Sequence, residues 1–219
     1  PACAPAWAGL ATAHACLNEW FGTGAAGLAK ARQTSRMALQ LAPQLADAHV
    51  ARGLAKSLSH RYDEARTAFE EAIRLDPYSF DAHYFFARTS FAFGDARRAS
   101  ELYRLAAELR EEDFQSPLLL GLSLRALGRR DAAHEAERMG IIRAEQALAR
   151  DPSNGRALSL AAGSLFENGE AERAMAWSRR SLELHPDDAS AMVNAACLQT
   201  MAGCEDAALG LLERVFAQG

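Results

Sequence analysis

Several kinds of residue are scarce in this 219-residue sequence, and each scarcity argues against a class of protein. Lysine occurs only at Lys30 and Lys56, and the net charge is −4, so a nucleic-acid-binding protein with a clustered basic face is not expected. Runs of Val, Ile and Thr are missing, which argues against β-strands. No apolar run approaches the roughly 18 residues that span a bilayer, so we expect no membrane segment.

The four cysteines lie near the two ends of the chain, and no pair has the CxxC spacing. This pattern favours neither a disulfide framework nor a zinc site, so we interpret them as small, partly buried helix residues. Thiols without a framework suit a reducing compartment, and we expect a cytoplasmic protein, with the periplasm as the open alternative. No signal peptide is visible, but the chain begins at Pro1 rather than Met, so this adds little to the choice.

Catalytic and metal-binding motifs are also missing. No GxxxxGK[ST], GxSxG or GxGxxG string occurs, and His134-Glu135 begins like an HExxH zinc helix but has Arg138 where the second histidine should be. We therefore predict a protein that is not an enzyme and that uses no metal or cofactor. The acidic runs Glu111-Glu112-Asp113 and Asp187-Asp188 are interpreted as solvated or N-capping groups at helix junctions.

Alanine is abundant, and apolar residues follow a helical period. Residues 46–79 contain two amphipathic helical patterns separated by a short polar turn at His60-Arg61. Asp63 is the expected N-cap of the second helix, and Pro77 marks its end because proline cannot continue a helix. The sequence therefore predicts a helix–turn–helix hairpin in this stretch.

The hairpin recurs about every 34 residues along the chain, and we call this interval the repeat step. Small residues return at this step, for example Gly53, Ala87 and Gly121 in the first helices and the turn glycines Gly94 and Gly128. A period of about 34 residues with small, aromatic and proline landmarks is the signature of tetratricopeptide repeats (TPRs), and the sequence resembles that family. In the clearest repeat the landmarks are, in order, Gly53, Ala65, Phe69, Ala72 and Pro77.

The resemblance implies an all-α fold in which about six hairpins stack into a right-handed α–α superhelix, or solenoid. We expect residues 1–219 to form a single solenoid domain. The expected repeats cover residues 4–43, 46–79, 80–113, 114–154, 155–188 and 189–219.

The first repeat contains an insertion, because its two halves are out of phase by eight residues. Gly22-Thr23-Gly24 supplies the break, and we expect a longer loop there with Trp20-Phe21 beside it. This loop either covers the exposed end of the stack or has a function of its own.

The fourth repeat has seven extra residues between Ala133 and Pro152. Seven residues make nearly two helical turns, so we predict one long helix over about residues 131–149. Met139 and Ile142 are assigned to its apolar face, and Gly140 is interpreted as its weak point.

Two short stretches resemble a narrower group of proteins. These are AWAGLA with KARQTSRMALQLAPQLADAH near the start of the chain, and NAACLQTMAGCEDAALGLLERVF near its end. They are similar to the TPR region of multidomain bacterial signalling proteins, in which such repeats follow a cyclase-type, kinase-type or winged-helix domain. This resemblance implies a C-terminal fragment of a larger bacterial regulator.

In TPR proteins the first helix of each hairpin lines a concave groove. The resemblance therefore implies a scaffold or interaction module that binds a peptide or a partner surface there. The alternative is a structural segment that packs on its own effector domain or forms a homodimer. The groove positions carried over from the family are Val50, Leu54, Leu58, Tyr84, Arg88, Phe91, Leu118, Leu122, Arg125, Arg156, Phe166 and Val193.

Arginines interrupt this apolar and aromatic row at Arg88, Arg125 and Arg156. A guanidinium can hold a carboxylate through two hydrogen bonds. We therefore expect the partner to be a protein or peptide that is mostly apolar and carries acidic residues. In the alternative, these arginines pair with acids of their own chain, such as Asp81 or Glu167.

Overall fold

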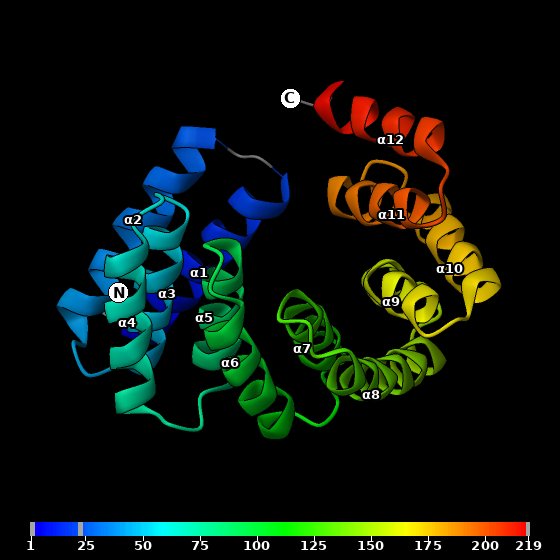
Figure 1. Cartoon of the computed structure of the whole chain (residues 1–219). Helices are drawn as coiled ribbons and strands as arrows, with labels where there is room; N and C mark the ends of the chain where they lie inside the picture. Colours follow the sequence, from blue (N-terminus) through cyan, green and yellow to red (C-terminus); the bar gives the residue numbers. More distant parts are fainter. Residues whose placement is uncertain (1–2, 22–23, 218–219) are drawn as a thin grey trace. The chain divides into compact units, whose positions relative to one another are not determined.

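A computed structural model describes residues 3–21 and 24–217 of the protein, without the side chains of residues 19–21. This part of the chain folds into twelve α-helices and contains no β-strand, which confirms the predicted all-α class (Figure 1). The helices are α1 Ala4–Phe21, α2 Gly24–Leu41, α3 Ala46–Ser57, α4 Tyr62–Leu75, α5 Phe80–Ala92, α6 Ala96–Leu109, α7 Gln115–Ala126, α8 Arg130–Arg150, α9 Gly155–Glu167, α10 Ala171–Leu184, α11 Ala189–Met201 and α12 Glu205–Ala217.

The chain divides into two compact units, residues 1–110 and 111–219, which we call unit 1 and unit 2. In unit 1 the helices pair as α1–α2, α3–α4 and α5–α6, and α3 packs against α1, α2 and α5. In unit 2 they pair as α7–α8, α9–α10 and α11–α12, and α9 packs against α7, α8 and α11. Each unit is therefore a three-hairpin stretch of a helical-repeat solenoid. That residues 1–219 form one continuous domain stays a prediction.

The turns inside the hairpins follow the repeat step. Gly94, Gly128, Gly169 and Gly203 all have positive φ, between 73° and 86°. Glycine adopts this left-handed conformation without the steric cost that a Cβ atom brings. His60 occupies the same place in the second hairpin and has a φ of 54°. The predicted turn glycines are therefore confirmed.

Small residues at the repeat positions lie where two helices meet. A Cβ atom on Gly53 would come within 2.7 Å of the Phe69 ring, so α3 and α4 approach each other closely only because residue 53 has no side chain. The alanine four residues before Phe69 and its equivalents in the next two repeats are also buried. Ala65, Ala99 and Ala133 are fully inaccessible to solvent. Close packing of this kind maximises dispersion contacts between the helices.

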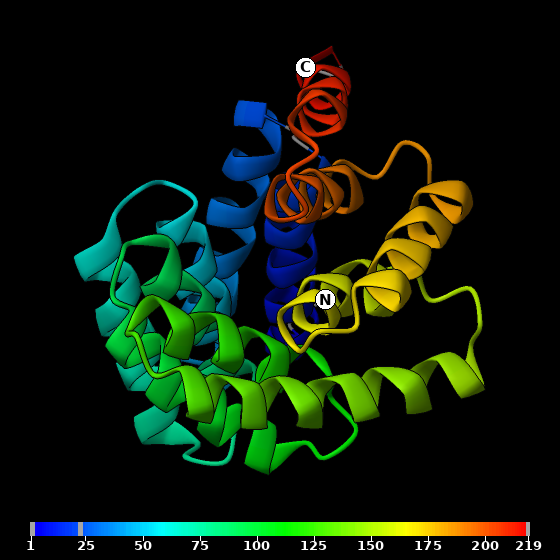
Figure 2. The same cartoon turned by 45° about the vertical axis from the view of Figure 1, so that its right-hand side comes forward.

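Helix α8 is continuous over 21 residues, whereas α4, α6 and α10 each have 14. The difference equals the seven-residue surplus in the sequence, so the predicted long helix is confirmed. It is the long lime-green helix in the lower part of Figure 2.

Two details of the α8 prediction were wrong. Met139 and Ile142 are 43% and 53% exposed, and Ile141 lies in the core instead. Gly140 is also not a weak point, because a Cβ atom there would meet the Leu118 backbone nitrogen at 2.9 Å. Glycine at this position lets α8 approach the start of α7, and this packing offsets its low helix propensity.

The inserted residues of the first repeat lengthen its helices. Both α1 and α2 have 18 residues, more than the 12 or 13 of the other first helices and the usual 14 of the second helices. The sequence predicted that the insertion lengthens the loop. In the structure most of it lengthens the two helices instead, so that prediction was wrong. Residues 22–23 and the side chains of Trp20-Phe21 lie outside the described part of the chain.

The N-cap side chains of α5, α6, α9 and α11 accept a backbone hydrogen bond, whereas the N-cap residues of α3, α4, α7, α8 and α10 make no such bond. The Asp188 carboxylate accepts hydrogen bonds from the backbone N–H groups of Ser190 and Ala191, at 2.8 and 3.1 Å, as expected for a capping group. The prediction that Asp63 caps α4 was wrong, since that helix begins at Tyr62 with Arg61 before it. Asp63 lies in the first turn, where its charge still favours the helix dipole.

Candidate functional site

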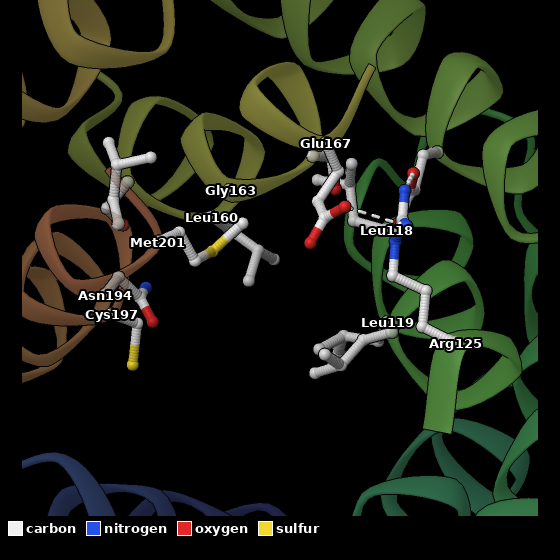
Figure 3. Close-up of a pocket in the computed structure, with 14 residues that line it drawn as sticks. Leu118, Leu119, Arg125, Leu160, Gly163, Glu167, Asn194, Cys197 and Met201 are labelled. Carbon is white, nitrogen blue, oxygen red and sulfur yellow. Dashed lines mark hydrogen bonds and ion pairs between the residues drawn. The ribbon is translucent and has the colours of Figure 1, made fainter. Parts of the chain in front are cut away.

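A groove with a volume of about 210 Å³ opens across the first helices of unit 2, α7, α9 and α11. Five leucines and one methionine are among its lining residues, and Figure 3 shows Leu119 and Met201 on opposite sides of the space. Leu122 is 48% exposed and Met201 is 40% exposed, so both offer apolar surface to a partner. The lining residues are Leu118, Leu119, Leu122, Arg125, Glu137, Ser159, Leu160, Gly163, Ser164, Glu167, Asn194, Cys197, Leu198 and Met201.

A charged cluster closes the groove at the end of α7. The Arg125 guanidinium donates to both carboxylate oxygens of Glu137, with Nε–Oε1 at 2.6 Å and Nη2–Oε2 at 2.7 Å. A third nitrogen, Nη1, lies 2.8 Å from the Glu167 carboxylate, and Figure 3 marks an interaction between Arg125 and Glu167. Arg125 is therefore held by two acids of its own chain, which agrees with the alternative in which the groove arginines pair internally.

The cluster is largely buried, and a further side chain bonds to it. The Glu137 side chain is only 3% exposed and that of Arg125 is 19% exposed, while Glu167 keeps 37% of its surface accessible. The Asn168 amide donates to Glu137 at 2.9 Å and also to the Ser164 carbonyl. Hydrogen bonding to Glu137 raises the pKa of Arg125 above its ordinary value, and burial opposes this shift.

The buried carboxylate occupies a position that is aromatic in the preceding repeats. Phe69, Tyr103 and Glu137 succeed one another at the repeat step. A Cβ atom on Gly121 would meet Glu137 Cγ at 2.4 Å, just as one on Gly53 would meet the Phe69 ring. Glu137 therefore uses the space that an aromatic ring fills in the second repeat. A charged residue at this periodic position was the sequence signal that could have identified it.

Three predicted groove residues of unit 2 lie at this site and three do not. Leu118, Leu122 and Arg125 line the groove, although Leu118 is only 2% exposed. The remaining three lie outside its lining: Arg156 donates from Nε to Gln115 at 3.1 Å, Phe166 packs against the core, and Val193 is 39% exposed.

The residues that sequence reasoning missed share repeat positions. Leu119, Leu160 and Asn194 are equivalent in the three hairpins of unit 2, and so are Leu122, Gly163 and Cys197. The missed Asn194 is a direct neighbour of the predicted Val193, and Glu167, which was expected only as a partner of the arginines, is a direct neighbour of Phe166. A rotation of about 100° per residue along a helix places such neighbours on different faces.

The predicted groove residues of unit 1 are mostly buried. Val50, Leu54 and Tyr84 are each 5% exposed or less, so they offer little surface to a partner. Leu58, Arg88 and Phe91 are partly buried. The Arg88 guanidinium lies 5.7 Å from the centre of the Tyr84 ring, within the range of a cation–π contact.

Two histidines make the same contact at the start of successive first helices, α3 and α5. His49 Nε2 lies 2.8 Å from the Pro43 carbonyl oxygen, and His83 Nε2 lies 3.0 Å from that of Pro77. Both bonds join a helix to the loop before it at the same repeat position, so the two histidines have the same packing role. Within residues 3–21 and 24–217, no group of three or more His, Cys, Asp or Glu side chains is arranged to hold a metal ion. No helix in the same stretches is long and apolar enough to span a membrane.

Residues 57–123 match the family model described as tetratricopeptide repeat. The helical hairpins of the described residues define the class, a helical-repeat protein, and the matched stretch is similar to tetratricopeptide repeats. A comparison with curated proteins gives no match.

Several solved structures share the fold. A chain of the APC/C hetero-tetramer Cut9–Hcn1 has 15% identity and a TM-score of 0.69, over all of this chain and 41% of that one. The pilF protein of Pseudomonas aeruginosa has 16% identity and a TM-score of 0.63, over 95% and 88% of the two chains. YrrB, described as a TPR protein with an unusual peptide-binding site, has 21% identity and a TM-score of 0.51, over 87% and 91%. At these identities the similarity establishes the fold alone.

Proposed function

We propose that this protein is a non-catalytic interaction scaffold and that the groove across α7, α9 and α11 binds a segment of a partner protein. The observation that carries the proposal is an apolar groove with exposed Leu122 and Met201, closed at one end by a fixed charged cluster. Apolar surface supplies binding free energy, while fixed charges orient the ligand. The peptide-binding site named for YrrB supports this use of the fold, although it belongs to that protein.

The partner that suits this groove is an apolar helix or extended segment. The sequence alone favoured acidic residues on the partner, because Arg125 was expected to face it. In the structure, Arg125 is paired with Glu137 and Glu167, and these three side chains carry a net charge of −1. Because the exposed Glu167 carboxylate lies at the groove, we propose a basic residue at that end of the segment. Acidic residues elsewhere on the partner are compatible with this proposal.

A second candidate function is self-assembly or packing on an effector domain. The observation in its favour is apolar exposure on the last helix, α12, where Leu209 and Phe216 are 58% and 81% exposed. We also retain, as proposals, a cytoplasmic location and an origin in a larger bacterial regulator. The first is supported by four cysteines that form no disulfide among the described residues, and the second only by the resemblance of the quoted stretches.

The test begins with a photo-crosslinking residue at Leu122 to identify the partner segment. Its synthetic peptide is then titrated against wild type, Leu122→Asp and Leu184→Asp. Leu184 is the matched control, since it is 40% exposed on α10 and lies outside the groove. A charge in the apolar groove should weaken binding by at least about ten-fold, and the control should leave it unchanged.

Two results would count against the groove. Equal binding by both variants would place the partner elsewhere. Loss of the partner only with Phe216→Asp, together with a change from dimer to monomer in light scattering, would instead support assembly through α12.

A further inference from the structure

Unit 1 contains a cluster of arginines that the groove does not involve. Helix α2 carries Lys30, Arg32 and Arg36 but no Asp or Glu. Arg52 of α3 lies close enough to Arg36, Arg61 and Arg32 for their charges to act on it, and the opposite charge of Glu64 offsets part of this repulsion. We call Arg32, Arg36, Arg52 and Arg61 the arginine cluster. It is a basic patch on a chain whose net charge is −4.

The acids beside the cluster are already engaged. Glu64 accepts a hydrogen bond from Lys56 and forms an ion pair with Arg61. This hydrogen bond from Lys56 holds the pKa of Glu64 below its ordinary value. In the part of the chain that the structure describes, Arg32, Arg36 and Arg52 form no ion pair. Three guanidinium groups therefore lack a direct carboxylate partner.

Arg52 occupies a position that other repeats fill with apolar residues. Phe86 and Leu120 follow it at the repeat step, and Phe86 is fully buried. Burial and the neighbouring Arg36 together lower the pKa of Arg52 below its ordinary value. At this position the charge of Arg52 is repelled by other arginines and is partly removed from water. An apolar side chain would have neither of these energetic costs.

Arg52 also faces open space. It lines a hollow of about 600 Å³ between α3 and α4, together with His49, Lys56, Thr67 and Arg74. The three carboxylates of this hollow each have a cation of their own: Glu64 pairs with Lys56, Glu70 with Arg98, and Glu71 with Arg74. A ligand that enters the hollow therefore meets Arg52 as the cation without a direct carboxylate partner.

We propose that the arginine cluster binds an oxyanion on an acidic segment of a protein partner, with Arg52 as the central contact and Arg36 and Arg32 beside it. Guanidinium groups bind carboxylate and phosphate oxygens through paired, charge-assisted hydrogen bonds. Such a ligand would relieve the repulsion among the arginines. The same chemistry can come from Asp and Glu side chains or from phosphorylated Ser or Thr. This site lies in unit 1 and is independent of the groove in unit 2.

The test uses the full chain and three fluorescent peptides of one length, carrying a run of Glu, of phosphoserine, or of Gln. Fluorescence anisotropy at about 0.15 M salt measures each dissociation constant, because that ionic strength screens weak long-range attraction. We expect the Glu or the phosphoserine peptide to bind and the Gln peptide not to bind. The tighter of the two anionic peptides identifies the source of the oxyanion.

Variants then localise the binding. Arg52→Leu, which introduces the kind of residue that other repeats have, should weaken the anionic peptide by about ten-fold or more, and the exposed Arg36→Ala should weaken it by about three-fold. Arg97→Ala is the matched control, because that side chain is 81% exposed on α6 of the same unit. Circular dichroism checks that each variant is folded. Unchanged binding by folded Arg52→Leu and Arg36→Ala would overturn the proposal. So would equal binding of the Gln peptide, or tighter binding of a single-stranded oligonucleotide or of anionic vesicles than of either anionic peptide.

Discussion

The two units use arginine in opposite ways on the same repeating scaffold. In unit 2, Arg125 is mostly buried and is bound by Glu137 and Glu167. In unit 1, Arg52 is partly buried among other arginines and forms no ion pair with the described residues. The two arginines are at different repeat positions, since Arg125 corresponds to Ser57 and Arg52 to Leu120. Arg125 is paired because Glu137 stands where unit 1 has Phe69. A carboxylate at a periodic aromatic position thus makes Arg125 a structural residue, whereas Arg52 has no such partner.

The largest expected effect is the loss of Arg125. Arg125→Ala leaves the Glu137 carboxylate buried without its cation, and we expect it to lower the free energy of unfolding by about 3 kcal/mol. Urea denaturation measures the loss, and hydrogen exchange should locate it in α7 and α8. The control is Arg74→Ala in unit 1, which breaks an exposed pair with Glu71 and should leave the free energy of unfolding almost unchanged.

A double variant separates the buried charge from packing. Arg125→Leu with Glu137→Phe restores the glycine–aromatic contact found between Gly53 and Phe69, so it should recover most of the lost stability. An equal cost for Arg125→Ala and Arg74→Ala would mean that the two units do not differ in the way described.

The next effect concerns Gly140 of unit 2. Gly140→Ala places a Cβ atom 2.9 Å from the Leu118 backbone nitrogen, and we expect a loss of about 2 kcal/mol in the free energy of unfolding. The matched variant is Gly210→Ala on α12, where a Cβ atom meets nothing within 4 Å. That change should stabilise the chain by about 0.5–1 kcal/mol through helix propensity. Stabilisation by both alanines, measured by thermal unfolding, would restore the interpretation of Gly140 as a weak point.

A smaller effect of opposite sign is expected at Arg52. Arg52→Leu removes a partly desolvated charge from an arginine cluster and supplies apolar contact, so it should raise the free energy of unfolding by about 1 kcal/mol. The same change in unit 2, Arg125→Leu, should be destabilising because it strands Glu137. Thermal melts of both variants at low and high salt test this contrast. A destabilised Arg52→Leu would show that Arg52 makes a structural contribution.

The smallest effect concerns two aspartates whose pKa values are shifted in opposite directions. Partial desolvation raises the pKa of Asp81 in unit 1, whereas hydrogen bonding from Ser153 lowers that of Asp151 in unit 2. The contribution of Asp81 to stability is therefore present at acid pH and is lost as the pH rises through its folded pKa. That of Asp151 is present above the unfolded pKa and is lost as the pH falls through its folded pKa. Carboxyl NMR titration should give a higher midpoint for Asp81 than for Asp151, and the reverse order would contradict both assignments.

Much of the fold could be predicted because its signals are local. The repeat step, the turn glycines and the surplus in α8 all follow from spacing along the chain, and all agree with the structure. The groove was predicted less well. Leu118, Leu122 and Arg125 were identified, but Glu137, Leu160 and Asn194 were not. Glu137 acts through Arg125 on the paired helix, and Leu160 and Asn194 border the groove together with residues of other helices, so the hydrophobic period of one helix does not specify these roles.

The sequence by itself determined the helices, their order and the turns between them, since hydrophobic periodicity, glycine and proline act over a few residues. Only the tertiary structure decided which side chains of each helix face the groove and which are buried in the core. Phe166 packs on the core while its neighbour Glu167 reaches Arg125, and Gly140 gains its importance from Leu118 on another helix. The physical reason is that one residue turns a helix by about 100°, so the rotation of each packed helix assigns neighbouring side chains to core or groove.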